Sequence, residues 1–187
     1  MPEYNFAQRK DDVLNKLDKS YAQKWDKRIK MLCDKINKNP NYFTTSSCSG
    51  RVLLMIDKER KSPGLFLWIS HDRIRSDDLR RALSSFERKN LVKFKCEPPI
   101  IHIVCKNLPF AQNLLEKGQK AGWKNSGIIN LRRNFVVELH GTEKLELPMF
   151  QDRKFLVNGE FLELITKKSN EKLEKGWKLI KSLEREI

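Results

Sequence analysis

Short apolar runs of strand length recur through the chain, and they constrain the fold more than any other feature. Their spacing, and the turn residues between them, predict strands at 51–57, 65–70, 91–96, 100–105, 127–131, 134–140, 144–148 and 154–157. Apolar residues at helical spacing predict helices from Phe6 to Tyr21, Trp25 to Ile36, Ser76 to Phe86, Asn107 to Gly122 and Gly159 to Glu186. This succession predicts an α+β fold.

We expect a curved, mixed sheet with packed helices, a pair of helices at the N-terminus and a long helix at the C-terminus. Ser49-Gly50 and Ser126-Gly127 each precede a predicted strand, which hints at an internal duplication of the sheet. No linker or low-complexity tract interrupts the chain, so a single domain over residues 1–187 is expected. No Gly-x-Gly-x-x-Gly follows a first strand, so the fold should be non-Rossmann.

The charge of the chain favours a polyanionic partner. Lys and Arg number 38 against 24 Asp and Glu, which gives a formal net charge of +14. A surface adapted to heat adds charges of both signs and so does not account for this excess. We therefore expect a nucleic acid as the partner. No apolar run is long enough to span a membrane, so a cytoplasmic protein without a membrane partner is expected.

The cysteines do not suggest a metal site. None of the four forms a Cys-x-x-Cys pair, which argues against a zinc ribbon. His102 and Cys105 have the spacing of two ligands, but on a strand their side chains point to opposite faces. No metal is therefore predicted.

The polar segment 43–51, Phe-Thr-Thr-Ser-Ser-Cys-Ser-Gly-Arg, leads directly into an apolar strand. It is either a turn rich in serine and threonine, whose hydroxyls bond their own backbone, or a site that grips a polar ligand. Its guanidinium group suits bidentate binding of a carboxylate or phosphate. Its thiol has no base nearby in sequence and fits a binding wall better than a nucleophile. The binding candidates are Ser46, Ser47, Cys48, Gly50 and Arg51.

A second polar segment precedes the strand predicted at 127–131. Asn125, Ser126 and Gly127 offer an amide, a hydroxyl and a permissive backbone, and the two polar segments are candidates to converge on one site. Trp123, between Gly122 and a lysine, is the best candidate for an exposed surface on which a base could stack.

Two histidines lie at positions where functional side chains emerge. His71 closes a predicted strand and precedes a polar turn. His102 lies among isoleucines and valine, where a half-buried imidazole needs a hydrogen-bond partner. An ordinary structural histidine remains an alternative for each.

These motifs together resemble the tRNA wybutosine-synthesizing protein 3 family, in its archaeal form. Segment 44–51 is similar to the Ser-x-Ser-Ser-Cys-x-Gly-Arg signature of that family. The resemblance continues through 68–71 and 122–128 and covers most of the chain before the last helix. One departure is Gly118, which interrupts a predicted helix where alanine would be expected.

The resemblance implies an enzyme that uses S-adenosylmethionine to methylate N-4 of tricyclic demethylwyosine, 3′ to the anticodon of phenylalanine tRNA. We hypothesise that Ser46, Ser47, Gly50 and Arg51 hold the substrate or the amino-acid end of the cofactor. His71 or His102 would lie near the accepting nitrogen, with Asp26 as an alternative proton acceptor.

Two other classes of function fit the same residues. A non-catalytic RNA-binding module would use the same basic surface, and a structural interaction domain would carry its lysines for solubility alone. Binding of S-adenosylmethionine separates the enzyme from both alternatives.

Overall fold

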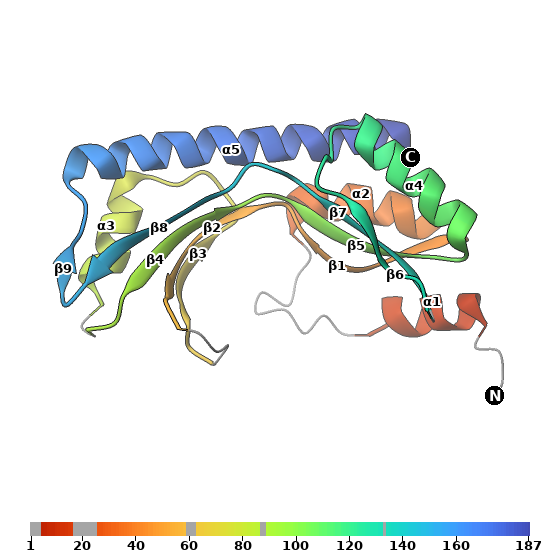
Figure 1. Cartoon of the computed structure of the whole chain (residues 1–187), viewed down its shortest axis with the longest axis horizontal. Helices are drawn as coiled ribbons and strands as arrows, with labels where there is room; N and C mark the ends of the chain where they lie inside the picture. Colours follow the sequence, from red (N-terminus) through yellow and green to blue (C-terminus); the bar gives the residue numbers. More distant parts are fainter. Residues whose placement is uncertain (1–4, 17–25, 59–62, 87–88, 133) are drawn as a thin grey trace. The chain divides into compact units, whose positions relative to one another are not determined.

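The computed structural model describes residues 5–16, 26–58, 63–86, 89–132 and 134–187 (Figure 1). Its helices are α1 Phe6–Leu14, α2 Lys27–Lys38, α3 Ser76–Ser84, α4 Leu108–Lys120 and α5 Gly159–Glu186. Its strands are β1 Tyr42–Cys48, β2 Arg51–Ile56, β3 Phe66–Ser70, β4 Val92–Glu97, β5 Ile100–Cys105, β6 Gly127–Asn130, β7 Phe135–His140, β8 Leu145–Gln151 and β9 Lys154–Phe155. None of the described helices is long and apolar enough to cross a membrane.

The chain folds into two compact units, each with its own sheet. Unit 1 comprises Met1–Ser49, Pro99–Thr142 and Trp177–Ile187, and unit 2 comprises Gly50–Pro98 and Glu143–Gly176. Each unit is assembled from separate stretches of chain, so neither can be excised as one continuous segment. The single domain expected over residues 1–187 stays a prediction.

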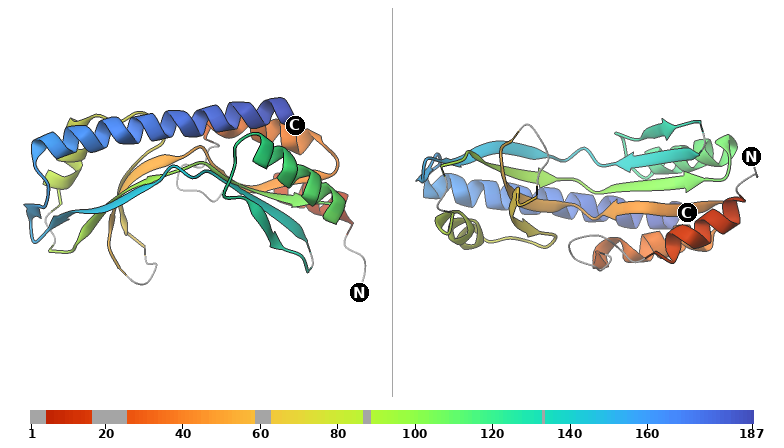
Figure 2. Two further views of the ribbon diagram at one scale, coloured as in Figure 1. Left: turned by 45° about the horizontal axis from the view of Figure 1, so that its top comes forward. Right: turned by 90° about the horizontal axis from the view of Figure 1, so that it is seen from below.

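Unit 1 is built on a four-stranded sheet in the order β1-β5-β7-β6. Helices α2 and α4 and the last turns of α5 cover one face, where Trp123, Leu139 and Ile180 are among the buried core residues (Figure 1). Helix α1 packs against the other face near the start of β1, where the Phe6 and Phe43 ring centroids are 5.3 Å apart (Figure 2). The rest of this second face, which we call the open face, carries the polar side chains described below.

Unit 2 is built on a five-stranded sheet in the order β3-β2-β4-β8-β9. Alternate residues of β4 are buried, as a strand with one covered face requires. The covering elements are α3 and the first part of α5 (Figure 1). The Cys96 thiol lies 3.9 Å from the Ser169 carbonyl oxygen of α5, and the ring centroids of Phe86 and Phe150 are 6.1 Å apart.

The α+β class, the helices near the N-terminus and the long C-terminal helix are confirmed. Positions 17–25 of the expected helix pair, including Trp25, lie outside the described residues. The expectation of mixed pairing is wrong, because every described strand pair is antiparallel. The two Ser-Gly segments lead into different sheets, since β2 belongs to unit 2 and β6 to unit 1.

The main difference from expectation is β1, because the sequence patterns predict no strand over this segment and indicate either a turn or a site that grips a polar ligand. Tyr42, Phe43, Thr44 and Thr45 are aromatic or β-branched, and such residues favour a pleated strand. Because β1 is an edge strand with one largely open face, Thr45 and Ser46 remain exposed without breaking a core.

Gly118 lies within α4 and is buried against β7. A Cβ atom at this position would approach Cδ2 of Leu139 to 2.6 Å, and Leu139 is 0% exposed. This close approach accounts for glycine where helix propensity favours alanine.

We expect Gly118→Ala to lower the free energy of unfolding by up to about 2 kcal/mol, because overpacking costs about 1–3 kcal/mol and the gain in helix propensity is about 1 kcal/mol. Urea denaturation measures the change. Leu139→Val in the same chain should recover part of the loss, whereas a stabilised Gly118→Ala would contradict the close packing.

Candidate functional site

A β-bulge in β1 decides which of its polar side chains reach the open face. Thr44 is paired with Ile103 of β5, but Ser46 is paired with the adjacent residue, His102, so Thr45 is the extra residue. Thr44 faces α2, where its backbone N–H donates to Oδ1 of Asn37 at 2.8 Å. After the bulge, Ser46 shares the open face with its cross-strand partner, His102.

Three side chains then form a hydrogen-bonded line across neighbouring strands of unit 1. Ser46 Oγ lies 2.8 Å from His102 Nδ1, and His102 Nε2 lies 2.6 Å from Glu138 Oε2 on β7. Gly127 of β6 is paired with Glu138, and a Cβ atom at Gly127 would meet nothing within 4 Å. We call Ser46, His102, Glu138 and Gly127 the polar row.

The chemistry of the polar row follows from its donors and acceptors. An ionised Glu138 can only accept, so the proton between it and His102 belongs to Nε2. In the neutral imidazole, Nδ1 then accepts a hydrogen bond from the Ser46 hydroxyl. The side chains of His102 and Glu138 are 30% and 31% exposed, so the pair is accessible from the open face. This arrangement can take up a proton delivered at the Ser46 hydroxyl.

Asp26 and Ser47 have contacts on the covered side of unit 1. Asp26 is the N-cap of α2, where Oδ1 accepts from the Arg28 backbone at 3.1 Å and Oδ2 accepts from the Ser49 backbone at 2.9 Å. The Ser47 side chain hydrogen-bonds to Cys33 of α2. Asp26 therefore ties α2 to the residue that follows β1, and its role as a proton acceptor stays a prediction.

The remaining residues of the polar segment belong to unit 2. Gly50 has φ of +96°, and a Cβ atom there would lie 3.1 Å from the Glu97 carbonyl oxygen. Its own carbonyl oxygen lies 3.2 Å from His71 Nδ1. Arg51 Nε donates to Glu97 Oε2 at 2.7 Å, and its guanidinium lies 5.6 Å from the centroid of the Phe66 ring. The structure thus brings Gly50, Arg51 and His71 together and adds Glu97, to which sequence reasoning assigned no role.

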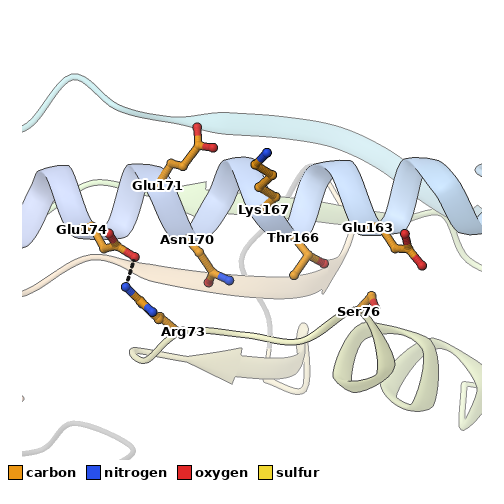
Figure 3. Close-up of a pocket in the computed structure, with 8 residues that line it drawn as sticks. All are labelled: Arg73, Ser76, Glu163, Thr166, Lys167, Asn170, Glu171 and Glu174. Atoms are coloured by element: carbon orange, nitrogen blue, oxygen red, sulfur yellow. Dashed lines mark ion pairs between the residues drawn. The ribbon is translucent and has the colours of Figure 1, made fainter.

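A groove of about 440 Å³ in unit 2 lies between α5 and the segment that leads into α3 (Figure 3). Its side chains hold that segment in place. Asn170 exchanges two hydrogen bonds with the backbone of Ile74, at 2.9 and 3.0 Å, and Arg73 pairs with Glu174 at 2.5 Å. No candidate from the sequence lines this groove, and its contacts secure the turn that follows His71.

The second polar segment is mainly structural. The expectation of an exposed Trp123 is wrong, because Trp123 is 0% exposed and its Nε1 donates to the Leu179 carbonyl oxygen at 3.2 Å. The left-handed turn at Gly122, with φ of +97°, directs the indole into the core. Ser126 Oγ donates to the Trp123 carbonyl at 2.7 Å and accepts from the His140 N–H at 3.1 Å. Asn125 is exposed, and Gly127 belongs to the polar row through its pairing with Glu138.

Glu138 is the member of the polar row that sequence reasoning missed. Within β7 it alternates with the buried Val137 and Leu139, which indicates a strand with one open face. Its place opposite His102 depends on the β5–β7 register, which no local pattern reveals.

Residues 8–187 match the protein family described as Methyltransferase TYW3. The chain belongs to this family. It is 35% identical to an Archaeoglobus fulgidus protein over 90% of this chain and 85% of the relative, which is named tRNA(Phe) 7-((3-amino-3-carboxypropyl)-4-demethylwyosine(37)-N(4))-methyltransferase. A Xenopus laevis relative, named tRNA wybutosine-synthesizing protein 3 homolog, is 32% identical over 91% of this chain and 70% of its own length.

Solved structures support the same relationship. A Pyrococcus horikoshii protein superposes with a TM-score of 0.88 at 28% identity, over 98% of this chain and 94% of that one. The methyltransferase family inferred from segment 44–51 is thereby confirmed, and the chain has the fold of a TYW3 protein.

The four thiols of the chain differ in burial. Burial raises the pKa of Cys33 and of Cys96 to about 11, and that of Cys105 to about 12. Cys48, on β1, is only half-buried. Since the thiolate is the reactive form, a raised pKa leaves very little reactive sulfur at pH 8.

We therefore expect iodoacetamide at pH 8 to label the folded protein at Cys48 first. Peptide mass spectrometry identifies the labelled residue, and Cys48→Ser should remove the fast phase. Guanidinium chloride should expose all four thiols. Labelling of Cys33 or Cys105 as fast as Cys48 in the folded protein would contradict this burial pattern.

Proposed function

We propose that this protein uses S-adenosylmethionine to methylate N-4 of the tricyclic demethylwyosine base 3′ to the anticodon of phenylalanine tRNA. The observation that carries the proposal is the family match over residues 8–187. The Archaeoglobus relative, whose name specifies this nitrogen and this tRNA, adds support at 35% identity. The reaction would take place in the cytoplasm, where the protein would meet its tRNA.

The net charge of +14 suits this substrate, because tRNA is a polyanion. A base of the anticodon loop is unpaired, so a protein can read its edge and its face directly. The open face of unit 1 offers a hydroxyl, an imidazole and a carboxylate in one line, which are groups that can hydrogen-bond a base edge.

Methyl transfer makes a second demand, which is a place for the cofactor. S-adenosylmethionine supplies an electrophilic methyl group on a sulfonium, and its amino-acid end carries a carboxylate and an ammonium. In unit 2, Arg51 and Glu97 form an ion pair whose side chains are 31% and 37% exposed. The guanidinium is complementary in charge to the carboxylate of the cofactor, and the Glu97 carboxylate is complementary to its ammonium. Phe66, 52% exposed, offers an aromatic face beside the guanidinium. These residues fit the cofactor, and we assign its amino-acid end to Arg51 and Glu97.

The non-catalytic RNA-binding module remains the second candidate, because the basic charge suits either function. The deciding experiment combines purified protein, S-adenosylmethionine labelled in its methyl group, and phenylalanine tRNA that carries demethylwyosine. We expect one methyl group per tRNA, located at N-4 by mass spectrometry of the nucleoside. The same tRNA with unmodified guanosine should stay unlabelled. Tight tRNA binding without any transfer would favour the binding module.

The cofactor assignment predicts the effect of removing the guanidinium. We expect Arg51→Ala to weaken binding of S-adenosylmethionine roughly 10- to 100-fold, because a hydrogen bond to a charged group contributes about 1.5–3 kcal/mol. Titration calorimetry measures the affinity. Glu97 is partly solvated in the wild type, so the variant should remain folded.

Arg75→Ala is the matched control, because the Arg75 side chain is 81% exposed and its ion pair with Asp77 is long, at 4.0 Å. This control should bind the cofactor as the wild type does. Equal affinity of Arg51→Ala and wild type would remove Arg51 from the cofactor site.

A further inference from the structure

The hydrogen-bonded line in the polar row is more ordered than it needs to be if its side chains only hydrogen-bond the edge of a nucleobase. Both ring nitrogens of His102 are engaged, one by a hydroxyl and one by a carboxylate, at 2.8 and 2.6 Å. A neutral imidazole has one donor and one acceptor nitrogen, and here neighbouring side chains satisfy both. A carboxylate on Nε2 selects the tautomer whose Nδ1 carries no proton and can receive one from the Ser46 hydroxyl.

Each member of the line comes from a different strand of the unit 1 sheet. Ser46 lies on β1, His102 on β5 and Glu138 on β7, and these strands are direct neighbours. The bulge at Thr45 aligns the first two, and the regular pairing of His102 with Glu138 aligns the others. Backbone ladders, rather than loops, therefore hold the three side chains in register.

From this geometry we propose that Ser46, His102 and Glu138 form a proton relay that accepts the proton released at the methylated nitrogen. This inference rests on the proposed methyl transfer. Ser46 is exposed and is the end of the line that a base on the open face would touch. Glu138 acts through His102 and is a positioning residue.

The relay balances the reaction. N-4 gains a methyl group and loses a proton, which passes to Ser46 Oγ while the hydroxyl proton passes to His102 Nδ1. The positive charge that leaves the sulfonium thus ends on the imidazole. There it faces the Glu138 carboxylate, which stabilises it in the half-buried site. No further reactant is needed.

The test compares Glu138→Gln with wild type. The amide has the shape of the carboxylate but lacks its charge, and it can donate to Nε2 as readily as accept from it. We expect kcat to fall about 100-fold or more, within the usual range for a general base, while KM for tRNA changes little. In the wild type, ¹⁵N NMR of His102 should show the neutral ring with its proton on Nε2. In Glu138→Gln it should show a mixture of the two neutral tautomers, with the proton on Nε2 in one and on Nδ1 in the other.

Glu186→Gln is a matched control in the same unit, because Glu186 is 29% exposed and pairs with Lys120, away from His102. It should keep the wild-type kcat. A second pair of variants tests the hydroxyl: Ser46→Ala should lose activity and Ser46→Thr should keep most of it, since threonine retains the hydroxyl and suits a strand.

The outcomes separate the relay from the proposed function. A wild-type protein that transfers no methyl group to any demethylwyosine tRNA overturns the proposed function, while the tautomer of His102 can still be measured. An active wild type with an equally active Glu138→Gln overturns the relay alone. The relay is also overturned if the neutral wild-type imidazole carries its proton on Nδ1, because that nitrogen could not then accept one.

Discussion

The β-bulge at Thr45 is the constraint on which the candidate site depends. Before it, Tyr42 and Thr44 point toward the helices that cover unit 1, and Tyr42 packs edge-on against Phe110 with ring centroids 5.9 Å apart. In a regular strand, Ser46 would continue on that covered face, because side chains alternate with a period of two. The extra residue turns Ser46 to the open face and leaves the aromatic anchors of β1 in place. One inserted residue thus gives a single strand a buried half and a half whose polar side chain at Ser46 is exposed.

The polar segment divides between the two units, which explains its unusual composition. The chain passes from unit 1 to unit 2 between Ser49 and Gly50. The hydroxyls on the unit 1 side serve the polar row and the contact with α2. The residues on the unit 2 side make a left-handed turn at Gly50 and an ion pair at Arg51. A short motif of this kind has no uniform role, because its neighbours differ from one residue to the next.

Local chemistry predicted much of the fold. The strand expected at 100–105 is β5, and the glycine expected to end α4 has the left-handed φ that such an end requires. The non-local features were not predictable in the same way. Trp123 follows a charged helix end and looks exposed, but the turn at Gly122 buries it. Glu138 and Glu97 lie opposite candidate residues only through strand register, which depends on tertiary packing rather than on neighbouring residues.

We propose that the tRNA base approaches the open face of unit 1, and this proposal can be tested directly at Gly127. Gly127 is paired with Glu138, and a Cβ atom at this position would meet nothing within 4 Å, so a side chain added here would extend onto the open face. The measurement is the single-turnover rate of methyl transfer by Gly127→Leu, compared with Gly127→Ala and with the unfolding free energy of both. We expect Gly127→Ala to stay active and Gly127→Leu to lose at least about tenfold in rate with its stability intact, equivalent to about 1.4 kcal/mol in the barrier. An undiminished rate in a folded Gly127→Leu would show that the base does not approach this face.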